Sequence, residues 1–470
     1  MLKLLAAIIC LIFLVSCGSG GSDTTNDMSG TSGENSITGE NYTPRTLMPE
    51  GIYDFPTLRI VSINDPFTQH RTYWHGGFAL VSGASEEYNF GPTAVSLRGR
   101  GNSTWYHGEE KRPLRLRFNH PRPMLDSGHA ATDWILLANL FDMSLLRNYA
   151  ALYLAAGLEN LDFTPFTRFV HLYVNDEYMG VYQLTDERDV IPGRMPLNFR
   201  DDAAESDHFF RMDAHVAGNV RRREGAVNIE GIDYFRAVDR IFEPRGVPRR
   251  NREAHTEYMR QFVIRVYEVA HRRNFEEISA IIDLPSFVDF YIVNEFLKNI
   301  DIGANSVFMS IRSADNVYDP STYEPTDDAL HRSARRLHFG PVWDFDRSAG
   351  NTIYWYEPEN IFATEKNPLF YELLAVPEIF EMIAARWQEI RHEQIHELLT
   401  HLEYLAHNYA AAFERNFVPH PHIFCPDYEP AWFRMVPPVK RDIHSFAEQA
   451  EYLLWWLHSR AAWLDEYFVV

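Results

Sequence analysis

The spacing of apolar residues changes along the chain, and this change constrains the fold more than any other feature of the sequence. Up to about residue 185, apolar and polar residues alternate in short runs bounded by Gly, Asn and Asp, which is the pattern of strands and hairpins. From about residue 255 the spacing becomes helical, which predicts helices over 258–271, 284–298, 377–401 and 443–468. We therefore expect an α+β protein. Its first part is mostly antiparallel sheet with one helix, over 142–156, and its second part is mainly helical.

The first 52 residues are expected to lie outside the folded part. Residues 1–16 carry one lysine and then an apolar run too short to span a membrane, which is typical of an export signal. The tetrapeptide 14–17, Leu-Val-Ser-Cys, matches the bacterial lipobox, in which Cys17 becomes the lipidated first residue; ordinary signal cleavage is the alternative. Residues 17–52 are rich in Gly, Ser, Thr and Asn, which predicts a flexible tether. We expect an exported lipoprotein, periplasmic or at the cell surface, and anchored in the outer membrane if there is one.

Length and charge limit the architecture and the partners. The chain has 470 residues, of which 46% are hydrophobic, and a formal net charge of −21. This length allows two lobes, expected over 53–190 and 256–470, which a polar, arginine-rich region with little regular structure, 191–255, connects. The negative charge argues against nucleic acid as a partner, because neutralising its phosphates requires a basic surface. If Cys17 is modified, Cys425 has no partner in the mature chain, and we expect no internal disulfide.

Two acidic clusters, over 294–305 and 341–350, each follow an apolar run, so each is expected where a helix or strand ends. The first contains Asp301 with Asn305 four residues on, and the second contains Asp344 and Asp346 before a glycine. Phosphotransferases divide the work in this way: one carboxylate orients a hydroxyl, while an Asn and later carboxylates hold Mg²⁺ against nucleotide phosphates. The alternative is that Asp301 caps a helix end and the other two acids lie in a solvated turn. The presence of both clusters in one chain favours the metal site.

A glycine-containing turn over 99–105 lies between two expected strands, and the second of these, 111–118, has one cationic face. The backbone N–H groups of such a turn, with Arg98, Arg100 and Asn102 beside them, are suited to hold phosphates. A hairpin with a solvated basic face is the alternative. Lys111 is one of five lysines in a chain that otherwise uses arginine, which suggests a site that requires a compact charge. A surface lysine is the alternative.

The motifs also occur in a specific order. They are 98–103 (Arg-Gly-Arg-Gly-Asn-Ser), Lys111 with its alternating strand, Trp134, Asp142 and Arg147-Asn148, 180–185, then Asn299, Asp301 and Asn305, and finally 343–346. With this ordered set the chain resembles, from about residue 53 to its end, the CotH kinase family of atypical protein kinases related to spore-coat protein H. The ordered set is specific, although no single motif is.

The resemblance implies a two-lobed, atypical protein-kinase-like fold with an antiparallel-sheet-rich N-lobe and a mainly helical C-lobe. It implies transfer of the γ-phosphoryl group of ATP, with Mg²⁺ or Mn²⁺, to the hydroxyl groups of a protein substrate. By the same resemblance Asp301 is the catalytic acid, the residues Asn305, Asp344 and Asp346 hold the metal, and Lys111 contacts the nucleotide phosphates.

The chain departs from the family pattern in two places. Asp186 stands where a Glu is usual, and a long polar insert, 313–335, separates the two acidic clusters. Two other functions fit the same residues: a surface scaffold that kept the fold and lost catalysis, and a metal-dependent phosphohydrolase that labels no protein. The joint retention of Lys111 and the acids argues against the scaffold.

Overall fold

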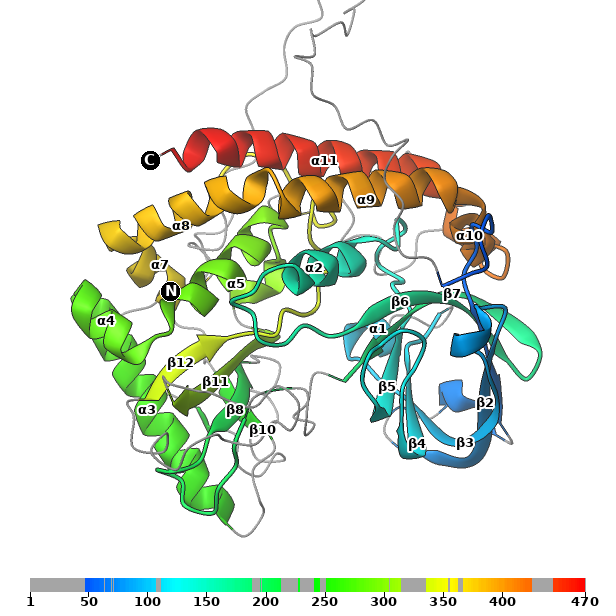
Figure 1. Cartoon of the computed structure of the whole chain (residues 1–470), viewed down its shortest axis with the longest axis horizontal. Coiled ribbons are helices and arrows are strands. Elements are labelled where there is room, and N and C mark those ends of the chain that lie inside the picture. Colours follow the sequence, from blue (N-terminus) through cyan, green and yellow to red (C-terminus); the bar gives the residue numbers. More distant parts are fainter. Residues whose placement is uncertain are drawn as a thin grey trace, which may run out of the picture. The chain divides into compact units, whose positions relative to one another are not determined.

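Seven strands of the first part of the chain close into a barrel in the computed structural model (Figure 1). Their order around the barrel is β1-β2-β3-β4-β5-β7-β6; β1 pairs with β6 in parallel, and the other neighbours are antiparallel. Along β4, Leu114, Leu116 and Phe118 are buried in the barrel core and alternate with arginines, as a strand with one apolar face requires. The strands are β1 (Thr57–Val61), β2 (Trp74–Ser82), β3 (Phe90–Gly99), β4 (Leu114–Arg122), β5 (Ala131–Leu137), β6 (Thr167–Val174) and β7 (Glu177–Asp186).

A second sheet, in the order β12-β11-β8-β10-β9, is assembled from two distant parts of the chain. Its strands are β8 (His208–Met212), β9 (Val227–Asn228), β10 (Ile241–Arg245), β11 (Val307–Ser313) and β12 (Arg335–Phe339). The expectation of little regular structure over 191–255 is wrong, because β8, β9 and β10 lie in this range. All five residues of β8 are buried, and β8 pairs with β11. Arginine runs dominate the composition of that region, and composition alone does not indicate a strand that is stabilised by pairing with a distant segment.

Helices form most of the remaining described structure. The first ones are α1 (Ser103–Tyr106), α2 (Arg147–Ala156), α3 (Arg252–Arg272), α4 (Phe275–Ile281) and α5 (Leu284–Phe296). They are followed by α7 (Pro368–Leu374), α8 (Pro377–Arg391), α9 (Gln394–Asn408), α10 (Ala410–Glu414) and α11 (Phe446–Tyr467). The single helix expected over 377–401 is two helices, because the backbone leaves the helical region at Glu393 (φ −112°, ψ −87°). Helix α9 packs against both α8 and α11 (Figure 1).

The structure describes residues 47–62, 64–68, 70, 72–106, 111–187, 195, 197–212, 227–228, 241–245, 251–303, 305–313, 335–353, 356–361, 367–424 and 443–469, all within one unit, Tyr42–Val470. The expected signal, Cys17, Cys425 and residues 314–334 of the insert lie outside them. Leu47 and Met48 are already buried, so the folded part begins before the expected residue 53. No helix within these ranges is long and apolar enough to cross a membrane.

The α+β class is therefore confirmed, and its N-terminal sheet is a closed barrel. Closure leaves no free edge among β1 to β7, because β1 pairs with β6 as well as with β2. The two-lobed, kinase-like arrangement and the boundaries at residues 190 and 256 stay predictions.

Candidate functional site

The first acidic cluster follows the end of α5, where the chain turns sharply. Lys298 has a left-handed backbone (φ 45°), and its side chain is buried. Its ammonium group donates to the Glu357 carbonyl at 2.7 Å and to Asn360 Oδ1 at 2.9 Å. The turn leads into a short 3₁₀ helix, Ile300–Gly303, on which Asp301 lies half-buried.

Backbone contacts hold Asp301 on both sides. Its amide donates to Asn299 Oδ1 at 3.0 Å, and its carbonyl accepts a hydrogen bond from the Asn305 amide at 2.8 Å. Asp301 and Asn305 are thereby joined in one turn and are both half-buried. The four-residue spacing in the sequence thus corresponds to a single local unit.

The second acidic cluster follows β12 and lies against the first. Asn299 Nδ2 donates to the Trp343 carbonyl at 3.4 Å, and the Ser306 hydroxyl donates to the Asp344 carboxylate. Ser306 (φ 53°) and Asp344 (φ 60°) both have left-handed backbones, a region that residues other than Gly enter rarely and mostly in turns or functional sites. The two sequence clusters therefore form one site.

Asp346 lies in an environment that disfavours its charged form. Burial, together with the carboxylates of Asp344, Asp301 and Asp142, raises the pKa of Asp346 to about 7, whereas Arg347 acts in the opposite direction. Carboxylates that share one low-dielectric site cannot all ionise without a compensating cation. The site therefore favours a cation or a proton.

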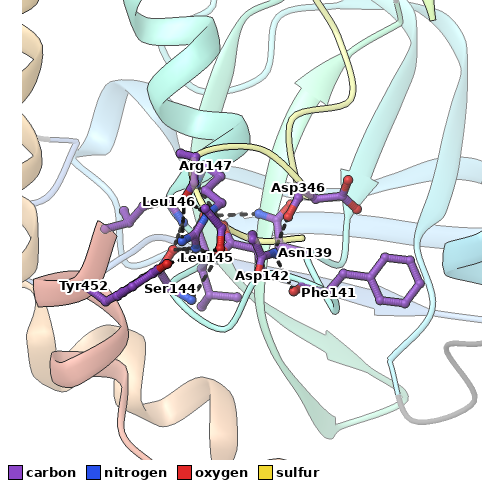
Figure 2. Close-up of polar contacts among 12 residues, drawn as sticks. Asn139, Phe141, Asp142, Ser144, Leu145, Leu146, Arg147, Asp346 and Tyr452 are labelled. Carbon is purple, nitrogen blue, oxygen red and sulfur yellow. Dashed lines mark hydrogen bonds and ion pairs between the residues drawn. The ribbon is translucent and has the colours of Figure 1, made fainter. Parts of the chain in front are cut away.

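A buried clamp holds the second cluster to the start of α2 (Figure 2). Arg147 donates through Nη1 to Asp142 Oδ1 at 2.5 Å, and neither side chain is exposed to solvent. The same guanidinium donates to the carbonyls of Ser348 (3.0 Å) and Ala349 (3.1 Å). Asp142 also accepts hydrogen bonds from the Ser144 hydroxyl at 2.6 Å and from the Arg147 amide at 2.8 Å. The clamp thus joins the loop before α2 to the residues that follow Asp346.

Three asparagines, at positions 139, 148 and 351, extend this clamp. Asn148 Oδ1 accepts a hydrogen bond from the Phe345 amide at 2.7 Å, between the two acids of the cluster. Asn148 Nδ2 donates to Asn139 Oδ1 at 3.0 Å. Asn351 Nδ2 donates to the Asp346 carbonyl at 2.5 Å. The backbone around Asp344 and Asp346 is therefore fixed by side chains that do not themselves belong to the acidic clusters.

Sequence reasoning missed the roles of several of these residues. Arg147, one of the residues in the ordered motif set, is buried and bound to Asp142. Asn139 and Asn351 carried no signal beyond their residue type, although Asn139 occupies a left-handed position (φ 49°) that Asn tolerates well. A second buried pair, Glu295 and Arg460, joins α5 to α11 at 2.7 Å and was also not anticipated.

The glycine turn places one arginine against the acidic segment. The Arg100 guanidinium lies 5.7 Å from the centre of the Trp343 ring, next to Asp344. Gly99 packs directly on Trp105, so a side chain there would collide with the indole ring, and Gly101 is left-handed (φ 93°). The turn is therefore shaped by close packing, and it brings Arg100 to the site.

The other candidates from this turn lie differently. Arg98 donates to the Gly99 carbonyl at 3.1 Å and lies 5.2 Å from the centre of the Tyr73 ring. Asn102 is exposed, and its carbonyl accepts the amides of the two residues that end α1. Of these three polar candidates, Arg100 is the one that contacts the acidic segment within the described part of the chain, through the Trp343 ring.

Lys111 is not at the surface. It is 1% exposed, and its ammonium donates to the carbonyls of Ala138 (2.7 Å) and Val181 (2.6 Å) and to Asn416 Oδ1 (2.7 Å). The surface-lysine alternative is therefore wrong. An ammonium has three protons, so these bonds use all of them. Burial holds the pKa of Lys111 well below its usual range.

Asp186, where the chain departs from the family pattern, and the next residue, Glu187, each have a partner on the barrel. Asp186 is buried, and its Oδ2 lies 2.8 Å from His129 Nε2. Glu187, the next residue, pairs with Arg115 at 2.9 Å on the outer face of the barrel, where Arg115 also meets Asp133 at 2.9 Å. Glu187 and Asp133 are therefore both acidic partners of the cationic strand β4.

The site offers carboxylate and amide oxygens, the donors that Mg²⁺ and Mn²⁺ prefer. The raised pKa of Asp346 fits a position that a divalent cation would neutralise. Within the described ranges, however, no three His, Cys, Asp or Glu side chains are close enough together to hold a metal ion. The types of donor atom therefore fit a divalent cation, and the Asp344 carboxylate also accepts a hydrogen bond from the Ser306 hydroxyl.

A comparison with protein-family models supports the family-level assignment. The model described as CotH kinase protein matches residues 97–464, which cover the glycine turn, both acidic clusters and most of α11. The chain belongs to the CotH kinase family, and at that level it is a kinase-like protein. No curated protein matches the chain.

Proposed function

We propose that this protein is an ATP- and Mg²⁺-dependent phosphotransferase that acts on hydroxyl groups of a protein substrate, and that lipid on Cys17 tethers it to the cell envelope. The observation that supports the chemistry is the joining of the two acidic clusters by the Asn299–Trp343 and Ser306–Asp344 hydrogen bonds. Kinase-like catalysis consists largely of positioning and charge stabilisation, for which acids held in this way are suited.

Asp301 orients the attacking hydroxyl in this proposal. It is half-buried on a short 3₁₀ helix whose backbone is fixed by Asn299 and Asn305. Asp344, Asp346 and Asn305 would hold Mg²⁺ or Mn²⁺, which neutralises negative charge on the transferring phosphoryl group. Arg147 keeps the loop of Asp344 and Asp346 in place from behind.

Arg100 is the arginine best placed for the nucleotide phosphates, because it lies over Trp343 beside the acids. Arg98 and Asn102 remain proposed phosphate contacts on the same turn. Lys111 contacts phosphate only if it gives up one of its three internal hydrogen bonds. We therefore assign Lys111 first to joining the end of β5 and the middle of β7 to the segment at Asn416.

The test is to incubate the purified full chain with radiolabelled ATP, Mg²⁺ and a panel of acceptor proteins, with Asp346→Asn as the matched inactive control. Label in protein that depends on Asp346 supports the proposal. Free phosphate without labelled protein identifies a phosphohydrolase. Nucleotide binding without either product identifies a scaffold, and both of these results overturn the kinase assignment.

A further inference from the structure

One face of α3 carries a stripe of residues that does not belong to the site described above. Tyr258, Phe262, Arg265, Val269 and Arg272 follow one another at intervals of four, three, four and three, which places them in one line along a helix. They line a broad groove, whose other side is made by α4 and by the first residue of β12. The residues that line the groove from that side are Ala204, Glu277, Ala280, Ile281 and Arg335.

The groove has an apolar floor that is held in place. Val269 and Ile281 are buried, whereas Tyr258 and Phe262 are half-buried and so present part of their rings to the groove. The Tyr258 ring stacks on His208 of β8, with 5.0 Å between ring centres. An apolar side chain of a ligand would therefore meet a formed surface.

The charges on the rim are mainly positive. Arg272 pairs with Glu277 at 2.6 Å, and Arg335 pairs with Asp207 at 2.8 Å. Arg265 is exposed and makes no ion pair with any residue that the structure describes. In the described part of the chain, the rim therefore carries Arg265 without an ion pair, beside two arginines that are paired. Of these two, the side chain of Arg272 is 52% exposed, whereas that of Arg335 is 7% exposed.

These arginines act on the floor as well. Burial raises the pKa of Tyr258; the positive charges of Arg335 and Arg265 oppose that rise, and Asp207 adds to it. The net charge of the chain is −21, yet charges beyond about 8 Å are screened at physiological salt, so these local arginines dominate what the groove attracts. An anionic ligand with an apolar part matches this combination.

The dimensions of the groove fit an extended peptide. From Tyr258 to Arg272 the helix rises about 21 Å, which is the length of about six residues of extended chain. Arg335, at one edge of the groove, precedes Asp344 by nine residues, so the two lie at most about 30 Å apart. A linker of about ten residues in a bound protein would reach from the groove to the acids.

We propose that this groove docks a carboxylate-rich, extended segment of the protein substrate, with an apolar side chain of that segment on the Tyr258–Phe262 floor. The proposal rests on the proposed phosphotransfer and adds a substrate class: proteins in which an acidic segment lies about ten or more residues from the hydroxyl that is modified. Docking away from the reacting groups adds affinity through effective concentration and does not alter the chemical step.

Binding is tested first without any chemistry. A fluorescein-labelled peptide of eight residues, composed of Glu and Leu, is titrated with the full chain and followed by fluorescence anisotropy. We expect binding that weakens with salt, and a dissociation constant raised about 3- to 10-fold by Arg265→Glu, because the rim interaction is exposed. Ala280→Trp, at an exposed position inside the groove, should weaken binding by filling it. Arg260→Glu, on the same helix but outside the groove, changes the net charge equally and should leave binding unchanged.

Absence of binding, or equal weakening by Arg265→Glu and Arg260→Glu, overturns the docking site. A concentration-dependent change in oligomeric mass that Ala280→Trp abolishes would make the groove an interface between copies of this chain, which also overturns it.

A kinetic measurement separates this inference from the proposed function. The acceptor for this measurement is a protein that the enzyme phosphorylates and that carries the Glu-Leu segment. With this acceptor, Arg265→Glu should have a higher KM than the unmodified protein and the same kcat. Equal KM values for the unmodified protein and Arg265→Glu would contradict the docking role of the groove and leave the proposed phosphotransfer intact. Peptide binding that depends on Arg265 without any phosphotransfer would retain the groove and remove the proposed function.

Discussion

Arg147 Nη1 lies 2.5 Å from Asp142 Oδ1, and neither side chain has any exposed surface. The pair joins the start of α2 to the carbonyls of Ser348 and Ala349, just after the acidic cluster that contains Asp344 and Asp346. The charges are fully desolvated, so each depends on the other. The geometry of the acids is thus coupled to a contact outside the acidic clusters.

Breaking this pair should destabilise the fold strongly. Arg147→Met leaves Asp142 buried without its cation, and we expect a loss of about 3–5 kcal/mol in the free energy of unfolding, measured with urea. The double variant Asp142→Asn with Arg147→Met should lose less than the sum of the two single variants, because no charge is then left alone. Arg260→Met, which removes an exposed pair with Glu257, is the control and should cost about 1 kcal/mol or less. Equal losses at the two arginines would contradict the buried-pair account.

The pH dependence of stability should report Asp346. Its folded-state pKa is about 7 against an ordinary value of 3.8, so the folded protein holds a proton that the unfolded chain releases between these values. Without metal, stability should therefore fall as the pH rises from about 4 to about 7. Asp346→Asn should remove this part of the fall and should raise the melting temperature at pH 8 in EDTA. A melting temperature at pH 8 that is no higher than in the unmodified protein would show that Asp346 is not the group that titrates.

Metal binding should show the opposite trend at the same residue. Mg²⁺ and a proton compete for the Asp346 carboxylate, so the apparent Mg²⁺ affinity should increase with pH up to about 7 and then level off. Calorimetric titration with Mg²⁺ alone, at pH 5.5, 6.5 and 7.5, measures this. A flat profile would remove Asp346 from the set of metal-holding residues.

The acids should divide into two kinetic classes. Asp301→Ala should keep most of the nucleotide affinity and lower the phosphotransfer rate by about 10²- to 10⁴-fold, because it acts mainly in the transition state. Asp344→Ala should instead weaken nucleotide binding that depends on Mg²⁺. Binding by thermal shift and turnover with labelled ATP separate the two effects. Full activity in Asp301→Ala would end the kinase assignment.

Lys111→Arg should affect stability more than nucleotide affinity. The larger guanidinium does not fit a position that is 1% exposed, so we expect a loss of about 1–3 kcal/mol in the free energy of unfolding. Arg117→Lys, on the half-exposed side of β4, is the matched control and should be close to neutral. Unchanged stability with weakened ATP binding would restore Lys111 to the phosphate site.

Cys17→Ser should release the protein from the membrane fraction, because it removes the lipidated residue. Cell fractionation followed by washing with salt and carbonate measures the release. A Cys17→Ser protein that still pellets and resists washing would contradict the lipoprotein prediction.

Local residue patterns in the sequence predicted several strands and helices of this protein. The alternation along 111–118 predicted β4, and the helical spacing over 284–298 predicted α5, because both patterns record which side of an element faces apolar surroundings. The residue types in the two clusters also indicated acids that act together, since hard cations and phosphates require such donors. These inferences depend only on the residue types and their spacing within one short segment of the sequence.

Tertiary structure decided what local patterns do not contain. Barrel closure depends on the parallel pairing of β1 with β6, which lie more than 100 residues apart along the chain. Strand β8 is likewise stabilised by its antiparallel pairing with the distant strand β11. The same holds for Lys111, whose three acceptors are Ala138 just after β5, Val181 on β7, and Asn416. The ammonium group of a residue chosen as a ligand of phosphate is thus buried and bonded within the protein. Burial and partners are set by which distant segments pack together, and the free energy of that packing is a property of the whole fold and of no single segment.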